Sequence, residues 1–108
     1  MTEDTITHGS ANVFADLGYP DATERQTKVR LVMALIDLIK DRNLKQAETA
    51  RLLGIPQPKV SALVNYRLDG FSVEKLMHFL TTLDQDVEIM IRPRPQAGPG
   101  SIAVLSVR

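Results

Sequence analysis

A short row of polar or small side chains lies within an apolar stretch near the middle of this 108-residue chain. The members of this row are Gln57, Lys59, Ser61 and Ala62. Val60 and Leu63, three residues apart, mark the opposite face of the helix that would carry the row. Proteins present amide, ammonium, hydroxyl and methyl groups of this kind to base edges in the major groove of DNA. The pattern therefore predicts a helix with one buried face and one base-reading face.

The residues just before this row have the spacing of a helix followed by a very tight turn. Ala50 is small enough to let two helices cross closely, and Gly54 supplies the positive φ that a short turn needs. Ile55 then anchors the turn in the core. We therefore expect a helix-turn-helix, with helices over residues 45–53 and 56–66. The alternative is a helical hairpin without a DNA partner, because such hairpins also contain single small residues and glycines.

The side chains of the predicted recognition helix differ in what they could contact. Gln57 suits paired hydrogen bonds to adenine, and the alternative is a solvated helix N-terminus. Lys59 could reach a guanine edge or a phosphate, and Ser61 could contact a base or a phosphate. Ala62 could meet a thymine methyl group or could be a neutral packing position.

Phosphate contacts are expected on both sides of the recognition helix. Gln46 opens the preceding helix, whose first amides would point at the DNA backbone. The residues after the recognition helix are expected to contact phosphates rather than bases: Asn65, Tyr66 and Arg67. Residues 40–67 hold six basic and two acidic side chains, a local excess of four positive charges in a chain of zero net charge. This modest excess suggests that two chains act together on DNA.

The composition excludes several other kinds of protein. The chain has no cysteine, which excludes disulfides, thiolate nucleophiles and cysteine zinc sites. His8 and His78 have no ligand-like spacing, and no serine, lysine or histidine arrangement resembles a nucleophile with its base. We therefore expect no metal, no cofactor and no enzymatic activity. No apolar run approaches the roughly 20 residues of a membrane span, so we expect a cytoplasmic protein without a membrane partner.

The helix-turn-helix lies inside one predicted domain over residues 12–92, which follows a mobile polar tail at residues 1–11. A short apolar cluster opens that domain: Val13, Phe14, Leu17 and Tyr19. Apolar periodicity predicts two further helices: residues 24–42 and residues 72–83. Asp21 or Thr23 could cap the first of these helices, and Ser72 is a good cap for the second.

After residue 84 the apolar period changes from helical to alternating. Val87, Ile89 and Ile91 alternate with more polar residues, which predicts a β-strand over residues 86–92. Prolines then interrupt the run, and residues 102–107 form a second β-prone stretch, unless residues 93–108 are a disordered tail. A lone strand leaves its amides unpaired. Either the two runs form a hairpin, or Val87, Ile89 and Ile91 lie at a homodimer interface.

Together these features resemble the lambda-repressor-like, Cro/XRE-type DNA-binding domains. Lys45-Gln46 is similar to the Thr-Gln pair that opens helix two in that family, and Gly54-Ile55-Pro56-Gln57 resembles its turn. Three longer segments resemble a subgroup that includes HigA-like antitoxins: NVFADLGYPDA (12–22), LGIPQPKVSALVNYRLDGFS (53–72) and LTTLDQDVEIMIRP (80–93). The resemblance implies a mainly α domain of four to five helices with one or two C-terminal β-strands, and it places Lys45 among the DNA contacts.

The resemblance also implies a function. Members of this group are autoregulating repressors, and many pair with a RelE-like ribonuclease toxin, whereas others are plain regulators. We therefore expect a homodimeric repressor on an inverted-repeat operator in double-stranded DNA. The alternative is an antitoxin whose main task is to neutralise a toxin protein. One departure from the family concerns Pro56, which stands where a serine or threonine usually caps the recognition helix and offers no side-chain acceptor.

Overall fold

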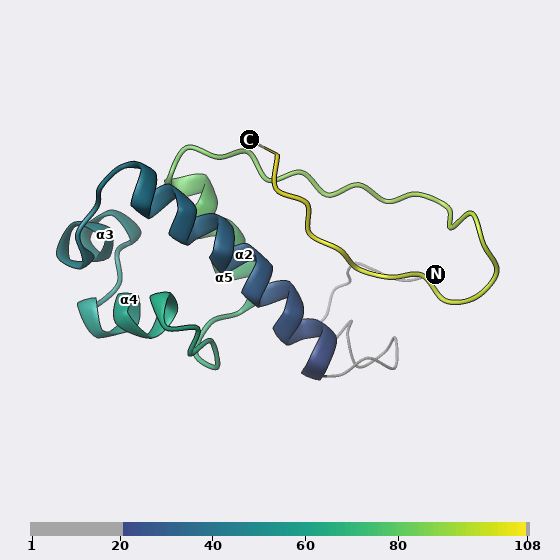
Figure 1. The fold of residues 1–108 in the computed structure, drawn as a ribbon, viewed down its shortest axis with the longest axis horizontal. Coiled ribbons are helices and arrows are strands. Elements are labelled where there is room, and N and C mark those ends of the chain that lie inside the picture. Colours follow the sequence, from purple (N-terminus) through teal and green to yellow (C-terminus); the bar gives the residue numbers. More distant parts are fainter. Residues whose placement is uncertain (1–20, 108) are drawn as a thin grey trace.

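The computed structural model describes residues 21–107, and this part of the chain contains four helices (Figure 1). Their bounds are α2, Asp21–Asp41; α3, Gln46–Leu53; α4, Gln57–Val64; and α5, Val73–Thr82. The long helix α2 packs mainly against α5, and the two short helices α3 and α4 pack mainly against each other. No helix among the described residues is long and apolar enough to cross a membrane.

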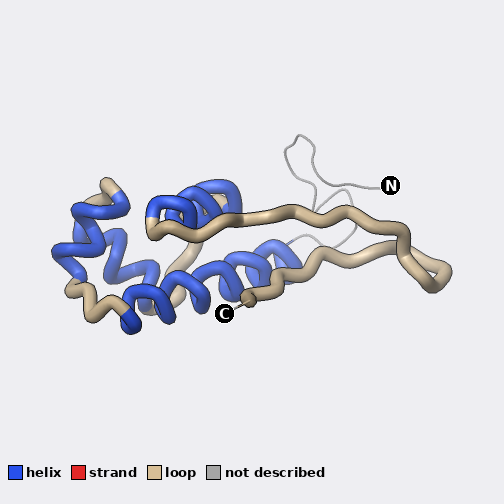
Figure 2. The backbone as a smooth tube through the Cα atoms, turned by 90° about the horizontal axis from the view of Figure 1, so that it is seen from above, coloured by secondary structure: helices blue, strands red, loops and turns tan. Residues whose placement is uncertain are grey.

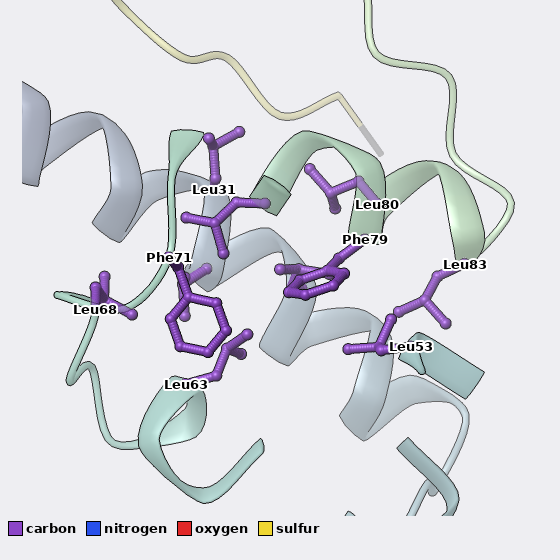
Figure 3. Packing of buried hydrophobic residues seen from close by; sticks show 11 residues of the cluster. Leu31, Leu53, Leu63, Leu68, Phe71, Phe79, Leu80 and Leu83 are labelled. Carbon is purple, nitrogen blue, oxygen red and sulfur yellow. The ribbon is translucent and has the colours of Figure 1, made fainter. Parts of the chain in front are cut away.

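One apolar core joins the four helices (Figure 3). Helix α2 contributes Leu31, Val32 and Leu35, and they lie on one side because Leu35 follows Leu31 by four residues and Val32 by three. The other helices and the segments on both sides of α5 meet this face with Leu53, Leu63, Leu68, Phe71, Leu76, Phe79, Leu80 and Leu83. The Phe71 and Phe79 rings meet edge to face, with centroids 6.0 Å apart. The core therefore fixes α4 relative to both α2 and α5.

The end of α2 is tied to the end of α5 by a single arginine. Asn43 has a φ of 53°, the left-handed conformation that often ends a helix and that asparagine tolerates better than most residues. Just before it, the Arg42 guanidinium donates a hydrogen bond of 2.6 Å to the Leu83 carbonyl oxygen. The same guanidinium lies 3.5 Å from the Asp84 carboxylate. The contact satisfies the carbonyl of the C-cap residue of α5, because carbonyls at a helix end lack partners within the helix.

The local signals for helix ends were partly right. Ser72 caps α5 as predicted, because its hydroxyl oxygen accepts a hydrogen bond of 3.0 Å from the Lys75 amide. Helix α2 begins at Asp21, earlier than the predicted residue 24, so Thr23 lies inside the helix and does not cap it. The Thr23 carbonyl accepts a hydrogen bond from the Thr27 hydroxyl instead. The predicted tail and the apolar cluster at residues 13–19 lie outside the described residues.

The predicted C-terminal strands are wrong for this structure. Among residues 21–107 the structure contains no β-strand (Figure 2). Residues 86–107 instead leave the helices as one extended run, turn, and come back as a second run. Alternation predicted an extended backbone, but a strand also needs a neighbour that completes its hydrogen bonds. Within the described chain neither run supplies that neighbour to the other.

The residues predicted at the dimer interface consequently divide into two groups. Val87 is half-buried and packs against the helical core. Ile89 and Ile91 do not pack on that core and are 70% and 81% exposed. A single chain therefore covers only the first of the three apolar side chains.

Candidate nucleic-acid interface

Helices α3 and α4 form the tight crossing that the sequence predicted. Gly54 ends α3 with a φ of 70°, and its amide donates a hydrogen bond to the Ala50 carbonyl. The next amide, that of Ile55, bonds to the same carbonyl at 3.1 Å. Ala50 is buried where the helices meet, and the half-buried Ile55 packs on the core. These contacts set the direction in which α4 leaves the turn.

Gly54 is needed for its backbone angle rather than for space. A Cβ atom built at Gly54 would meet no heavy atom within 4 Å. Its positive φ nevertheless disfavours any residue with a side chain, most of all a β-branched one. The turn thus needs glycine only because any other residue would be strained at this backbone angle.

The N-terminus of α4 has no side-chain cap, as the proline at its N-cap predicted. The Pro56 carbonyl accepts the amides of Lys59 at 2.9 Å and Val60 at 3.3 Å. Pro58 has no amide hydrogen to satisfy. Of the first three helical residues, only Gln57 is therefore left with an amide that has no partner in the described part of the chain. The two prolines lower the number of unsatisfied donors without a serine or threonine cap.

The predicted outward row of α4 is only partly exposed. Val60 and Leu63 are buried as expected, while Gln57 and Lys59 are exposed. Ser61 is half-buried, and Ala62 is half-buried and packs on the core. The packing alternative for Ala62 therefore has direct structural support. Gln57 and Lys59 are the side chains of this row that extend furthest into solvent.

Lys59 is held against the loop that precedes α5. Its ammonium nitrogen lies 5.3 Å from the centre of the Phe71 ring, a distance at which a cation is attracted to the ring face. The same nitrogen would lie 3.2 Å from a Cβ atom at Gly70, so a side chain there would crowd it. Neither of these neighbours of Lys59 was predicted from the sequence. A cation and an aromatic residue twelve positions apart carry no periodic signal that would indicate such a pair.

The segment after α4 is fixed by hydrogen bonds that close the helix. The Asn65 side-chain amide donates to the Ser61 carbonyl at 2.8 Å, and the Arg67 amide donates to the Ala62 carbonyl at 2.8 Å. Tyr66 between them has a φ of 59°, which is uncommon for an aromatic residue. Asn65 and Arg67 remain exposed, and Tyr66 is half-buried. The three predicted phosphate contacts thus lie in one well-defined turn.

Arg25 on α2 supports this turn, and no sequence pattern predicted this role. Its guanidinium donates a hydrogen bond of 3.2 Å to the Tyr66 carbonyl oxygen, across 41 positions of sequence. This bond places a guanidinium group next to the predicted phosphate contacts. No motif around Arg25 indicated it, because the contact depends on how α2 crosses the end of α4.

The start of α3, where Lys45 and Gln46 are the predicted phosphate contacts, has no side-chain cap hydrogen bond at its N-cap. The Glu48 carboxylate accepts the Lys45 amide at 2.9 Å, and Thr49 is fully buried with its hydroxyl donating to the Lys45 carbonyl. Lys45 and Gln46 are exposed. Lys45 has no side-chain oxygen to cap the helix, so the first amides of α3 remain available to an external acceptor.

The described residues contain no group of three or more histidine, aspartate or glutamate side chains placed to hold a metal ion. His78 is exposed on α5, and its carbonyl oxygen accepts the hydroxyls of Thr81 and Thr82. The chemistry that these surfaces offer is hydrogen bonding and positive charge, from Lys45 to Arg67 along the chain.

Comparison with known proteins places the chain in a family. Residues 13–92 match the model of a family described as a helix-turn-helix domain. A solved structure named as an XRE family transcriptional regulator is 56% identical, with a TM-score of 0.78; the match covers 82% of this chain and 100% of the other. No functionally curated protein matches. The chain belongs to the XRE-type family of helix-turn-helix proteins, which are DNA-binding regulators and not enzymes.

Proposed function

We propose that this protein is a sequence-specific transcriptional repressor that binds an inverted-repeat operator as a homodimer and regulates its own gene. The observation that carries the proposal is the exposed pair Gln57 and Lys59 beside the buried Val60 and Leu63 on α4. This arrangement leaves an exposed polar face on a helix that the core holds in place, which supports a role in contacting DNA. Two recognition helices in successive major grooves over a promoter would exclude polymerase.

Within this proposal, Gln57 reads bases and Lys59 binds a phosphate. Gln57 stands at the first turn of α4, where recognition helices contact base edges, and it is free to make paired hydrogen bonds to adenine. Lys59 points at the loop around Gly70 and Phe71, to the side of the helix rather than along it. A phosphate on the groove edge suits an ammonium group in that place. Ser61 is half-buried, and for this residue a contact to a base and a contact to a phosphate remain alternatives.

The remaining predicted contacts form two phosphate-binding groups in this proposal. The first is the start of α3, with Lys45, Gln46 and the amides of that helix end. The second is the turn after α4, with Asn65, Tyr66 and Arg67. Both groups lie beside α4 in sequence, in the segment with the excess of positive charge. Phosphate contacts of this kind fix the register of a protein on DNA but do not read its sequence. A cytoplasmic location is part of the same proposal.

A second candidate function is that of an antitoxin, which would bind a toxin protein in addition to DNA. The observation that favours a protein partner is the exposed apolar surface of the C-terminal runs. A neighbouring gene for a small basic ribonuclease-like protein, and co-purification of its product with this chain, would support this function. A gene without such a neighbour would argue against the antitoxin function and leave repression as the proposed function.

The decisive experiment for DNA binding is sequencing of the DNA fragments that the purified full chain retains at near-physiological salt. We expect enrichment of an inverted repeat, because two-fold protein symmetry is mirrored in the operator. Retention of DNA without any enriched sequence would overturn the proposal of sequence-specific repression. The matched control is the Gln57→Ala variant, which should still retain DNA but with a weaker preference.

A further inference from the structure

The C-terminal part of the chain leaves a long stretch of backbone and several large apolar side chains uncovered. Residues 86–107 run out and back as two extended segments (Figures 1 and 2). In the described chain no backbone hydrogen bond joins these segments to each other. The exposed apolar side chains are Ile89 at 70%, Met90 at 82%, Ile91 at 81%, Leu105 at 89% and Val107 at 92%. Extended apolar backbone with free edges is a template for pairing with another chain.

The charges of the outgoing segment are arranged so that it can pair with a copy of itself. Two acidic residues, Asp86 and Glu88, precede Met90, and two basic residues, Arg92 and Arg94, follow it at mirrored distances. All four side chains are exposed, and none forms an ion pair with another described residue. An antiparallel pair with its two-fold axis at Met90 sets residues opposite each other when their numbers lie equally far from 90. Each acidic residue then faces a basic residue of the second copy.

The neighbouring register is less favourable. A two-fold axis at Ile89 would set Asp86 opposite Arg92 but Glu88 opposite Met90. It would also set Arg94 opposite Asp84, which lies in a turn with a φ of 68° and is already 3.5 Å from Arg42. The axis at Met90 therefore pairs more of the opposite charges, and cross-strand pairs of opposite charge stabilise a sheet.

The prolines are compatible with the same axis. In an antiparallel ladder, the backbone groups of alternate residues bond to one neighbour, and those of the residues between them point to the other side. If Met90 and its copy form a hydrogen-bonded pair, the backbone groups of even-numbered residues form hydrogen bonds with the second copy. Pro93 and Pro95 have odd numbers, so the amides that they lack would face away from the second copy.

We propose that residues 86–94 of two chains pair as antiparallel strands about a two-fold axis at Met90, with Glu88 opposite Arg92 and Asp86 opposite Arg94 of the second copy. This register rests on the homodimer proposed above and specifies its interface. Val87, Ile89 and Ile91 share one face of the strand, since alternate residues point the same way. Val87 already packs on the helical core, so that face continues toward the helices.

The test uses charge reversal in the full chain, with dimer dissociation measured by analytical ultracentrifugation at low salt. Glu88→Arg alone turns both symmetric contacts into arginine–arginine contacts, and Arg92→Glu alone turns both into glutamate–glutamate contacts. Each single variant should raise the dimer dissociation constant about tenfold, because like charges directly opposite each other are destabilising. Glu74→Arg, an exposed charge reversal on α5, is the control and should leave the constant unchanged.

Mixing the two single variants is the sharper measurement. A heterodimer of Glu88→Arg with Arg92→Glu restores two opposite-charge contacts. The homodimer of a chain that carries both substitutions restores them too. Recovery to the parent constant in both cases supports the register. Equal constants for the parent and all variants would overturn the register while leaving the homodimer in place. A parent chain that stays monomeric at micromolar concentration would overturn the proposed homodimer as well as the register. If that monomer still retained operator DNA, DNA recognition would not depend on the homodimer.

Discussion

The ammonium nitrogen of Lys59 lies 5.3 Å from the centre of the Phe71 ring, which links the recognition helix to the loop before α5. Phe71 is buried and meets Phe79 edge to face, so its own position is fixed by the core. Lys59 therefore loses part of its rotamer freedom before it meets DNA. Preordering of a long side chain in this way lowers the entropic cost of a contact that the side chain makes later.

We predict that Lys59→Ala weakens DNA binding by the same factor on the operator and on unrelated DNA. A phosphate contact carries no sequence information, so its loss leaves sequence preference unchanged. The slope of log affinity against log salt concentration should fall by about 1, because one fewer counterion is released. Fluorescence anisotropy titrations at several salt concentrations measure both quantities. A loss confined to one base position would instead assign Lys59 to a guanine edge.

For Gln57→Ala we predict a change in sequence preference. Loss of a base contact should cost about 1–3 kcal/mol on the operator and relax the preference at a single position of each half-site. Binding to unrelated DNA and its salt slope should stay close to those of the parent. Titration against operators substituted at one position at a time measures this. An unchanged preference at every position would remove Gln57 from base reading and leave it as a solvated helix N-terminus.

Two substitutions at the crossing of α3 and α4 should destabilise the fold. Ala50→Leu inserts a large side chain at a buried contact and should cost about 1–3 kcal/mol of unfolding free energy. Gly54→Val forces a β-branched residue to a φ of 70° and should cost at least about 1–2 kcal/mol. Urea denaturation followed by circular dichroism measures both. The control Leu52→Ala changes an exposed residue of α3 and should have a small effect, whereas parent-like stability of the first two variants would contradict this helix register.

The proposed homodimer makes a prediction about operator geometry. The two recognition helices should lie about 34–36 Å apart and read half-sites about 10 base pairs apart, one turn of DNA. Insertion of five base pairs between the half-sites rotates one of them to the opposite side of the duplex. Affinity should then fall to that of a single half-site, and insertion of ten base pairs should restore part of it only if the dimer can stretch. Gel-shift titrations would show this, and indifference to spacing would argue for independent monomers.

Local sequence determined the parts of this protein that depend on neighbouring residues. The helical periods, the turn at Gly54, the cap at Ser72 and the left-handed end at Asn43 all follow from residue types within a few positions of each other. The buried face of Val60 and Leu63 follows from the same short-range spacing. These features were therefore predictable, and they were sufficient to identify the helix-turn-helix.

Only the tertiary structure decided how these elements meet, because those contacts join residues that are far apart in sequence. The Arg42 contact with Leu83 and the Arg25 contact with Tyr66 each span 41 positions, and no local pattern encodes them. The half-burial of Ala62 likewise depends on packing against the core. The C-terminal runs show the same limit most clearly. Alternation of apolar residues made residues 86–92 extended, but a β-strand requires a partner for its backbone, and the single chain does not provide one.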